Sequence, residues 1–383
     1  MHVGFSGMQR PYGERTKKVD MSVALKQKAF PYLVVATGII ICFGPSAMAI
    51  NCAGIFFTPV SENLGVERPA FALYLTIMLL STAFSLPILG KLNEHKDMRI
   101  MLSGAVVAVG ISLIAMGFSS ALWQFYIAGA LMGTGFAQLC ILAVPTLINR
   151  WFNKRVGFYV GLCMAFTGIG GMLFNLIGGY FIGSAPDGWR MAYVVFGVVA
   201  LVMSLPFTIL CVRSNPSDLG MLPVGLSASS EACDTVEAPI SGVSAAKASK
   251  SAAFGFLVVF AAICMTTIGF YHHIPSYATS LTQFPAVAAI AAGLASAVMA
   301  GQAFGKIAIG IINDKFNVKI GMFFAMFSGM AGLIAMLLAP GYVAVMLVAC
   351  FLFGIFYASG TVLIPLMTGA IFGQREYSQS IRE

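Results

Sequence analysis

Ten long stretches of apolar residues dominate this 383-residue chain, and none of them contains an acidic residue. A helix that crosses a bilayer needs ~20 apolar residues at a rise of ~1.5 Å each, and each stretch is about that long. The alternating pattern of an outer-membrane barrel is absent, so we expect the backbone polar groups to be satisfied within helices. The sequence therefore predicts an all-α, polytopic membrane helical bundle. The stretches are 32–59, 70–89, 100–118, 122–148, 157–182, 191–212, 253–277, 284–312, 320–339 and 342–372.

The charged residues, only 9% of the chain, lie almost entirely between these stretches. Placing both termini and the even-numbered loops on one side gives that side every Lys and Arg except Arg68 and Arg190, which predicts cytoplasmic termini. Lys306, the one charge inside a stretch, is placed near the cytoplasmic end of the eighth. We expect a multi-pass protein of the cell (cytoplasmic) membrane, with lipid as a partner and an uncleaved first helix. The net charge of +8 then reflects topology, and no nucleic-acid partner is expected.

Side chains suited to metal or covalent chemistry are sparse. All cysteines except Cys233 fall inside apolar stretches and form no CxxC pair, so they are interpreted as small core residues. The adjacent His272 and His273 are too few to hold a metal on a regular helix. We expect no cofactor, no metal and no enzymatic activity. A Walker-type phosphate loop is also absent from the sequence, which argues against ATP as the energy source.

A polar segment rich in Ser, Ala and Pro separates six apolar stretches from four and is interpreted as a cytoplasmic linker. The predicted organisation is a cytoplasmic tail over 1–29, a six-helix bundle over 30–212, the linker over 213–252, a four-helix C-terminal bundle over 253–372 and a cytoplasmic tail over 373–383.

The two sides of the linker match at a single offset of 220 residues, which predicts parallel repeats. The first copy continues for two helices beyond Arg155, whereas the second stops shortly after Arg375. We therefore expect two further helices beyond Glu383, with a true ten-helix protein as the alternative. The matched pairs are Gly90 with Gly310, Glu94 with Asp314, Arg99 with Lys319, Pro145 with Pro365, Phe152 with Phe372 and Arg155 with Arg375.

Loop 90–99 has a glycine at its start, an acidic residue four positions on and a basic residue at its end, and loop 310–319 has the same layout. This pattern resembles the loop between helices two and three of the major facilitator superfamily. The resemblance implies two six-helix repeats and a role of these loops in conformational gating, in which carboxylate and cation bridge helix ends. The gating candidates are Gly90, Glu94, Arg99, Gly310, Asp314, Lys319, Arg150 and Arg155.

The run 149–157, followed by a glycine-rich fifth helix, resembles the branch of oxalate/formate antiporters and monocarboxylate porters. Segment 174–179 lacks the Gly-Pro of the drug/proton antiporters, which argues against drug efflux. The oxalate/formate antiporters and monocarboxylate porters also place a basic residue in helix eight to meet the anionic substrate, yet 284–305 contains none.

The resemblance implies a central cavity lined by helices one, four, seven and ten. Polar side chains in these helices should face one another or water, because burial in lipid is costly. These side chains can contact a substrate or have a purely structural role. Amides also join helices, hydroxyls also bond their own backbone, and one histidine can face outside water. The substrate-binding candidates are Asn51, Gln138, His272, His273 and Tyr357, with Ser359, Thr361, Asn175 and Gln302 as further polar positions.

These observations predict a secondary transporter of a small organic anion, monocarboxylate- or dicarboxylate-like, that works by alternating access. The energy would come from the substrate gradient, an exchanged anion or a proton. The alternatives are a major facilitator transporter of a neutral or other small solute, and a truncated fragment that does not transport. We expect a monomer.

Overall fold

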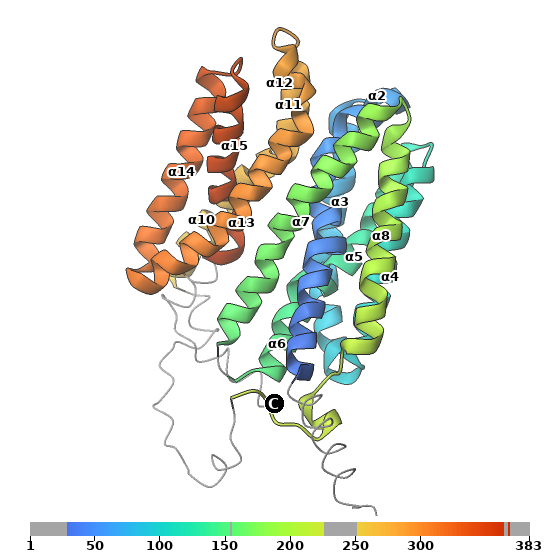
Figure 1. Cartoon of the computed structure of the whole chain (residues 1–383), viewed down its shortest axis with the longest axis vertical. Helices are drawn as coiled ribbons and strands as arrows, with labels where there is room; N and C mark the ends of the chain where they lie inside the picture. Colours follow the sequence, from blue (N-terminus) through green and yellow to red (C-terminus); the bar gives the residue numbers. More distant parts are fainter. Residues whose placement is uncertain (1–28, 154, 226–250, 364–366, 368–383) are drawn as a thin grey trace, which may run out of the picture.

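A computed structural model describes residues 29–153, 155–225, 251–363 and 367 (Figure 1). The terminal tails, most of the linker with Cys233, and the repeat positions Pro365, Phe372 and Arg375 lie outside the described residues. Ten helices in the described part are long and apolar enough to cross a membrane, which confirms the predicted fold class. They are Ala29–Asn51, Arg68–Asn93, Met98–Phe118, Leu122–Trp151, Val156–Ser184, Gly188–Cys211, Ala252–Ser280, Ala291–Asn313, Val318–Leu338 and Val343–Leu363.

The N-terminal half forms one bundle, coloured blue to yellow-green in Figure 1, and the last four spans form a second group beside it. The first half contains η1 (Cys42–Asn51), η2 (Ala53–Phe56), α2 (Phe57–Leu64), α3 (Arg68–His95), α4 (Met98–Phe118), α5 (Leu122–Phe136), η3 (Ala137–Ala143), α6 (Val144–Trp151), α7 (Val156–Ser184), α8 (Gly188–Cys211) and η4 (Pro216–Leu219). The second contains α10 (Ala252–Gly269), η6 (Phe270–His273), α11 (Ile274–Ser280), α12 (Pro285–Ala289), α13 (Ala291–Lys315), α14 (Val318–Leu338) and α15 (Val343–Tyr357).

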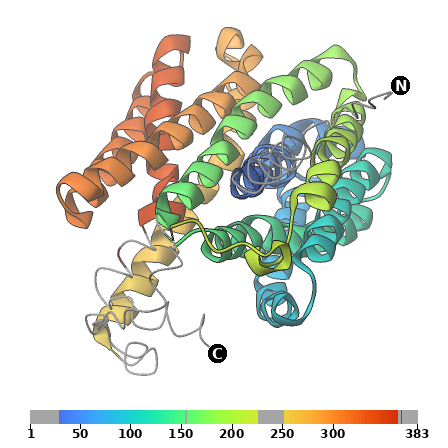
Figure 2. The same cartoon turned by 60° about the horizontal axis from the view of Figure 1, so that its bottom comes forward.

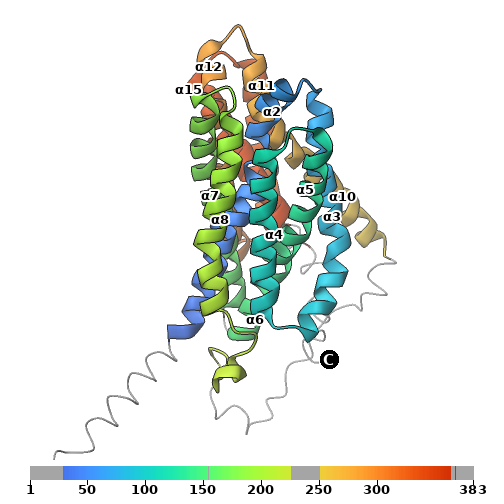
Figure 3. The same ribbon diagram turned by 90° about the vertical axis from the view of Figure 1, so that its right-hand side faces the viewer.

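The bundle has two distinct ends. Figure 3 shows α2, α11 and α12 together at one end, which we call the α2 end, and α6 at the other, which we call the α6 end. Seen from below, α7 of the first half and α13 of the second lie side by side where the two groups of helices meet (Figure 2).

The internal repeat is visible in the helix boundaries. Helix α4 and helix α14 begin 220 residues apart and also end 220 residues apart. Both are capped in the same way: Asp97 accepts a hydrogen bond from the backbone N–H of Arg99, and Asn317 accepts one from Ile320. The repeated loops thus end in equivalent helix caps.

Two spans change their helical winding near a proline. Helix one becomes π-helical over Cys42–Asn51, where Pro45 lies inside the turn, and the fourth span becomes π-helical over Ala137–Ala143, just before Pro145. Proline removes a backbone donor and collides with the preceding turn, so a wider turn accommodates it. The first of these segments ends at Asn51, and the second contains Gln138.

Small residues bring the two halves together along α7 and α13. A Cβ atom built on Gly168 would lie 2.9 Å from the backbone carbonyl oxygen of Met299, and one built on Gly171 would lie 2.8 Å from the side chain of Met299. Glycine is therefore required for this close helix approach. Large apolar side chains such as Phe84 and Phe327 cover the outside, at 75% and 76% exposure, as a surface facing lipid requires.

Candidate functional site

A buried lysine lies at the junction of the two halves. Lys306 of α13 is only 7% exposed, and its ammonium donates to the carbonyl oxygen of Met164 and the hydroxyl of Thr167 on α7, both at 2.8 Å. Lys306 lies in the last third of its span, Ala291–Asn313, near the end that the loop charges predict to be cytoplasmic. The structure adds that the side chain is buried there, against α7.

The charge on Lys306 has no acidic partner among the side chains that the structure describes. Its two hydrogen bonds use two of the three N–H donors of an ammonium group. A buried cation without a counter-ion is costly, and an incoming anion removes that cost. Lys306 is therefore the strongest anion-recognition feature in the described part of the membrane core.

A cluster of polar side chains surrounds Asn51, at the end of the π-helical segment of helix one. The Asn51 side chain donates to the carbonyl oxygen of Thr167 at 2.8 Å, and the Tyr357 hydroxyl approaches Asn51 Oδ1 at 3.4 Å. The Asn175 side chain and the Tyr271 hydroxyl both donate to the Asn51 carbonyl oxygen. The first span, α7, η6 and α15 thus meet through one connected network, and Thr167 links it to Lys306.

Tyr271 was not among the residues predicted from the sequence. It lies 220 residues after Asn51, which is the offset of the repeat, so equivalent positions of the two halves touch here. An alignment of the halves at that offset would have paired them. The hydroxyl was overlooked because an aromatic ring in an apolar stretch is usually core packing.

Several buried polar atoms near this network lack a partner in the described structure. They include Asn175 Oδ1, Gln302 Oε1, Ser359 Oγ and His272 Nδ1. Gln302 lies one helical turn before Lys306, so both are on one face of α13. Buried groups of this kind usually need hydrogen-bond partners, and a bound polar solute can supply them. Thr361, in contrast, donates to the carbonyl oxygen of Ala358 in its own helix.

The two histidines occupy different environments. His272 is buried at 7% exposure, between Tyr271 and Phe57, whereas His273 is exposed and lines a pocket at the α2 end. The helix changes to a 3-10 turn over Phe270–His273, which separates the directions of the two rings.

Gln138 lies away from the Asn51 cluster. It forms a reciprocal amide pair with Asn93 of α3, with bonds of 2.9 and 3.1 Å, inside the first bundle. This arrangement matches the alternative of an amide that joins two helices.

The gating candidates gather at the α6 end. Arg99 Nε donates to the carbonyl oxygen of Val212 at 3.3 Å, and Arg150 donates to the carbonyls of Ser214 and Asn93, both at 3.4 Å. The side chains of Glu94 and Asp314 lie outside the described ones, so the predicted bridges from these carboxylates to the basic residues stay a prediction. Arg155 adopts the left-handed conformation, with φ of 57°, directly before α7.

The glycines of the repeated loops do not mark a close contact between helices in this structure. A Cβ atom on Gly90 or Gly310 would meet nothing within 4 Å. Lys319 lies exposed in the first turn of α14.

The two halves touch directly at the α2 end. A Cβ atom on Gly54 would lie 2.6 Å from the backbone oxygen of His272, and the Thr58 hydroxyl donates to that of Ser276 at 3.0 Å. At this end, η2 and α2 of the first half therefore pack against η6 and α11 of the second.

Titratable groups suited to metal binding do not gather in threes within the described residues. The described cysteines are all free, and they are buried or half-buried as predicted for core residues.

A membrane bundle of repeated halves, with polar groups at their junction, is the architecture of secondary transporters. The chain belongs to the Major Facilitator Superfamily, whose profile matches residues 39–381.

Known proteins support this class. The chain is 30% identical to a glucose-6-phosphate exchanger, SLC37A2 of Xenopus laevis, over 39% of this chain and 30% of that one. It is 31% identical to the multidrug resistance protein MdtG of Escherichia fergusonii, over 37% and 33% respectively. The matches thus span about a third of these relatives.

A solved structure of a bacterial homologue of the human lysosomal transporter Spinster, in an inward-facing and occupied conformation, matches with a TM-score of 0.62 at 14% identity, over 91% of this chain and 77% of that one. Family, relatives and fold indicate a transporter and not an enzyme. The relatives do not single out the oxalate/formate and monocarboxylate branch.

Proposed function

We propose that this protein is a secondary transporter that moves a small organic anion across the membrane by alternating access. The observation that carries the proposal is Lys306, a buried cation at the junction of the two halves without a described acidic partner. An anionic carboxylate or phosphate group would accept a hydrogen bond from its remaining N–H. The monocarboxylate and dicarboxylate substrates expected from the sequence belong to this class, and so does a sugar phosphate.

The Asn51 cluster would hold the polar remainder of the substrate. Asn51 and Tyr357 supply an amide and a hydroxyl, and Gln302 supplies an unpartnered amide oxygen one turn from Lys306. Binding of an anion beside Lys306 would compete with the bonds that now tie it to α7. We infer that the substrate thereby weakens one contact between the halves, which lets them rock.

The contacts of η2 and α2 with η6 and α11 would close the α2 end, and the basic loops would form the cytoplasmic α6 end. With this orientation the protein lies in the cell membrane with both termini in the cytoplasm. A proton or an exchanged anion would drive accumulation. The candidate proton carrier is the buried imidazole of His272, whose Nδ1 has no hydrogen-bond partner in the described structure.

The proposal is tested by uptake into proteoliposomes containing the purified protein. Labelled oxalate, lactate and glucose 6-phosphate represent anions, and glucose is the neutral comparison. We expect saturable uptake of at least one anion and none of glucose. Replacing Lys306 by Gln should reduce that uptake at least tenfold, because a hydrogen bond to a charged group contributes about 1.5–3 kcal/mol.

Lys315→Gln is the matched control, since it removes the same charge from an exposed position of the same helix. It should transport like the unmodified protein. Lys306→Arg keeps the charge and should retain part of the uptake. Uptake of glucose alone would favour the neutral-solute alternative, and no uptake of any solute is the result expected of a fragment.

A further inference from the structure

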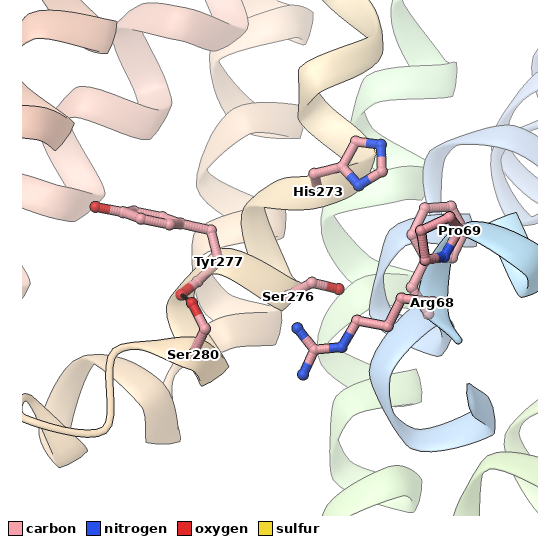
Figure 4. A pocket seen from close by; sticks show the side chains of 7 residues that line it. Arg68, Pro69, His273, Ser276, Tyr277 and Ser280 are labelled. Carbon is pink, nitrogen blue, oxygen red and sulfur yellow. Dashed lines mark hydrogen bonds between the residues drawn. The ribbon is translucent and has the colours of Figure 1, made fainter. Parts of the chain in front are cut away.

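A second polar pocket opens at the α2 end, separate from the Asn51 cluster. It has a volume of about 320 Å³ and is shared by both halves of the molecule. Figure 4 shows the Arg68 guanidinium extending toward Ser276 and Ser280, with His273 on the same side and Tyr277 turned away. The lining residues are Phe57, Arg68, Pro69, His273, Ser276, Tyr277 and Ser280.

Arg68 differs from Arg190, the other arginine near this end. The guanidinium of Arg190 donates to the carbonyl oxygens of Ser119 and Gly117 and lies 4.3 Å from the centre of the Trp189 ring. Its role is therefore structural.

The interaction that the structure gives Arg68 is an ion pair with Glu62 at 3.6 Å, in which the Arg68 side chain is 41% exposed and the Glu62 side chain 68% exposed. An exposed pair of this length contributes little, because water screens it. The planar donor fork of Arg68 is thus available to a ligand in the pocket, and this fork matches the oxygens of a carboxylate or a phosphate.

Two further donors complete the pocket. The Ser276 hydroxyl accepts a hydrogen bond from Thr58, which leaves its own O–H free to donate within the described contacts. The exposed imidazole of His273 can donate from a ring nitrogen. Of the pocket's lining residues, none is acidic. A guanidinium, a hydroxyl and an imidazole therefore face one small volume.

We propose that this pocket is a second anion site, which binds a carboxylate or phosphate group between Arg68 of the first half and Ser276 and His273 of the second. Since its walls come from both halves, the site exists only while α3 and α11 are held together. A bound anion would bridge them and stabilise the closed α2 end. The inference goes beyond the proposed function, because it does not require the substrate to bind at Lys306.

Binding is measured by titration calorimetry of the full chain in nanodiscs with sodium phosphate and, separately, sodium acetate at constant ionic strength. The Arg68→Gln change is made in the unmodified chain and in the Lys306→Gln chain, so the result does not depend on one background folding. We expect Arg68→Gln to weaken one binding event about tenfold or more in both. Lys315→Gln, the matched loss of charge at the other end, should leave that event unchanged.

Glu62→Gln separates a ligand site from a structural ion pair. Glu62 competes with the anion for Arg68, so its neutralisation should tighten binding about two- to fivefold. If Arg68 only held Glu62, neither change would affect binding, and the proposal would be wrong. Equal binding with and without Arg68 overturns it as well. A binding event that is lost in Lys306→Gln but kept in Arg68→Gln belongs to the central site and not to this pocket. Comparison of the affinities for phosphate and acetate identifies the group that the pocket prefers.

Discussion

Gly54 offers the sharpest test of how the α2 end closes. It packs against the backbone of His272, and a Cβ atom there would lie 2.6 Å from the carbonyl oxygen. Ordinary contact begins at 3.4 Å, and the neighbouring atom is backbone, so a side-chain rotation cannot relieve the clash. Gly54→Ala must therefore push η2 and η6 apart.

The expected size of the effect follows from the cost of overpacking, about 1–3 kcal/mol. In an alternating-access protein this cost applies only to the state in which the α2 end is closed. The equilibrium should shift toward the open state by a factor of about 5 to 150.

Cys52 is a natural reporter of this opening, because it is completely buried two residues from Gly54. Its labelling by a membrane-impermeant maleimide, quantified by peptide mass spectrometry, should accelerate in Gly54→Ala. Gly269→Ala is the matched control, since a Cβ atom there meets nothing within 4 Å. A folded Gly54→Ala protein that labels no faster than the control would refute the reasoning.

Two further predictions concern the first bundle and are measured by thermal unfolding. Asn93→Leu leaves the buried Gln138 amide without its partner and should cost about 1–3 kcal/mol, whereas unchanged stability would mean that the amide finds other partners. The hydrogen bonds that Asp97 accepts from the backbone of Arg99 and from Ser214 hold the pKa of its carboxyl below the usual 3.8. Its stabilising contribution is therefore present above pH ~4 and lost as the pH falls through the lowered pKa. The stability difference from Asp97→Asn should shrink between pH 5 and about pH 3, and a constant difference would contradict this assignment.

The helical fold and the repeat were accessible from the sequence because apolar length and loop charge are local properties. The bounds of α4 and α14 follow the predicted offset, and even their capping residues correspond. The π-helical segments were not predicted. Pro45 and Pro145 lie in or beside these segments, but the type of turn depends on packing against neighbouring helices.

The candidate site was only partly accessible. Asn51 and Tyr357 were predicted from their polarity and do lie in one network, whereas Gln138 pairs elsewhere, because a linear pattern does not specify which helix face meets which neighbour. Lys306 was placed near the cytoplasmic end of its stretch, but its burial between the two halves was not predicted. Its being the single charge within the apolar stretches was the signal that pointed to a buried role.

The central claim is that a substrate anion meets Lys306. It is tested most directly by solid-state NMR distance measurements on reconstituted protein with ¹⁵N-labelled lysine side chains and the transported anion, observed through ³¹P for a phosphate or ¹³C for a carboxylate. One lysine Nζ signal should be dephased by the anion, and this signal should be missing from Lys306→Arg. If no lysine is dephased, or if the dephased signal persists in Lys306→Arg, the anion does not bind at Lys306.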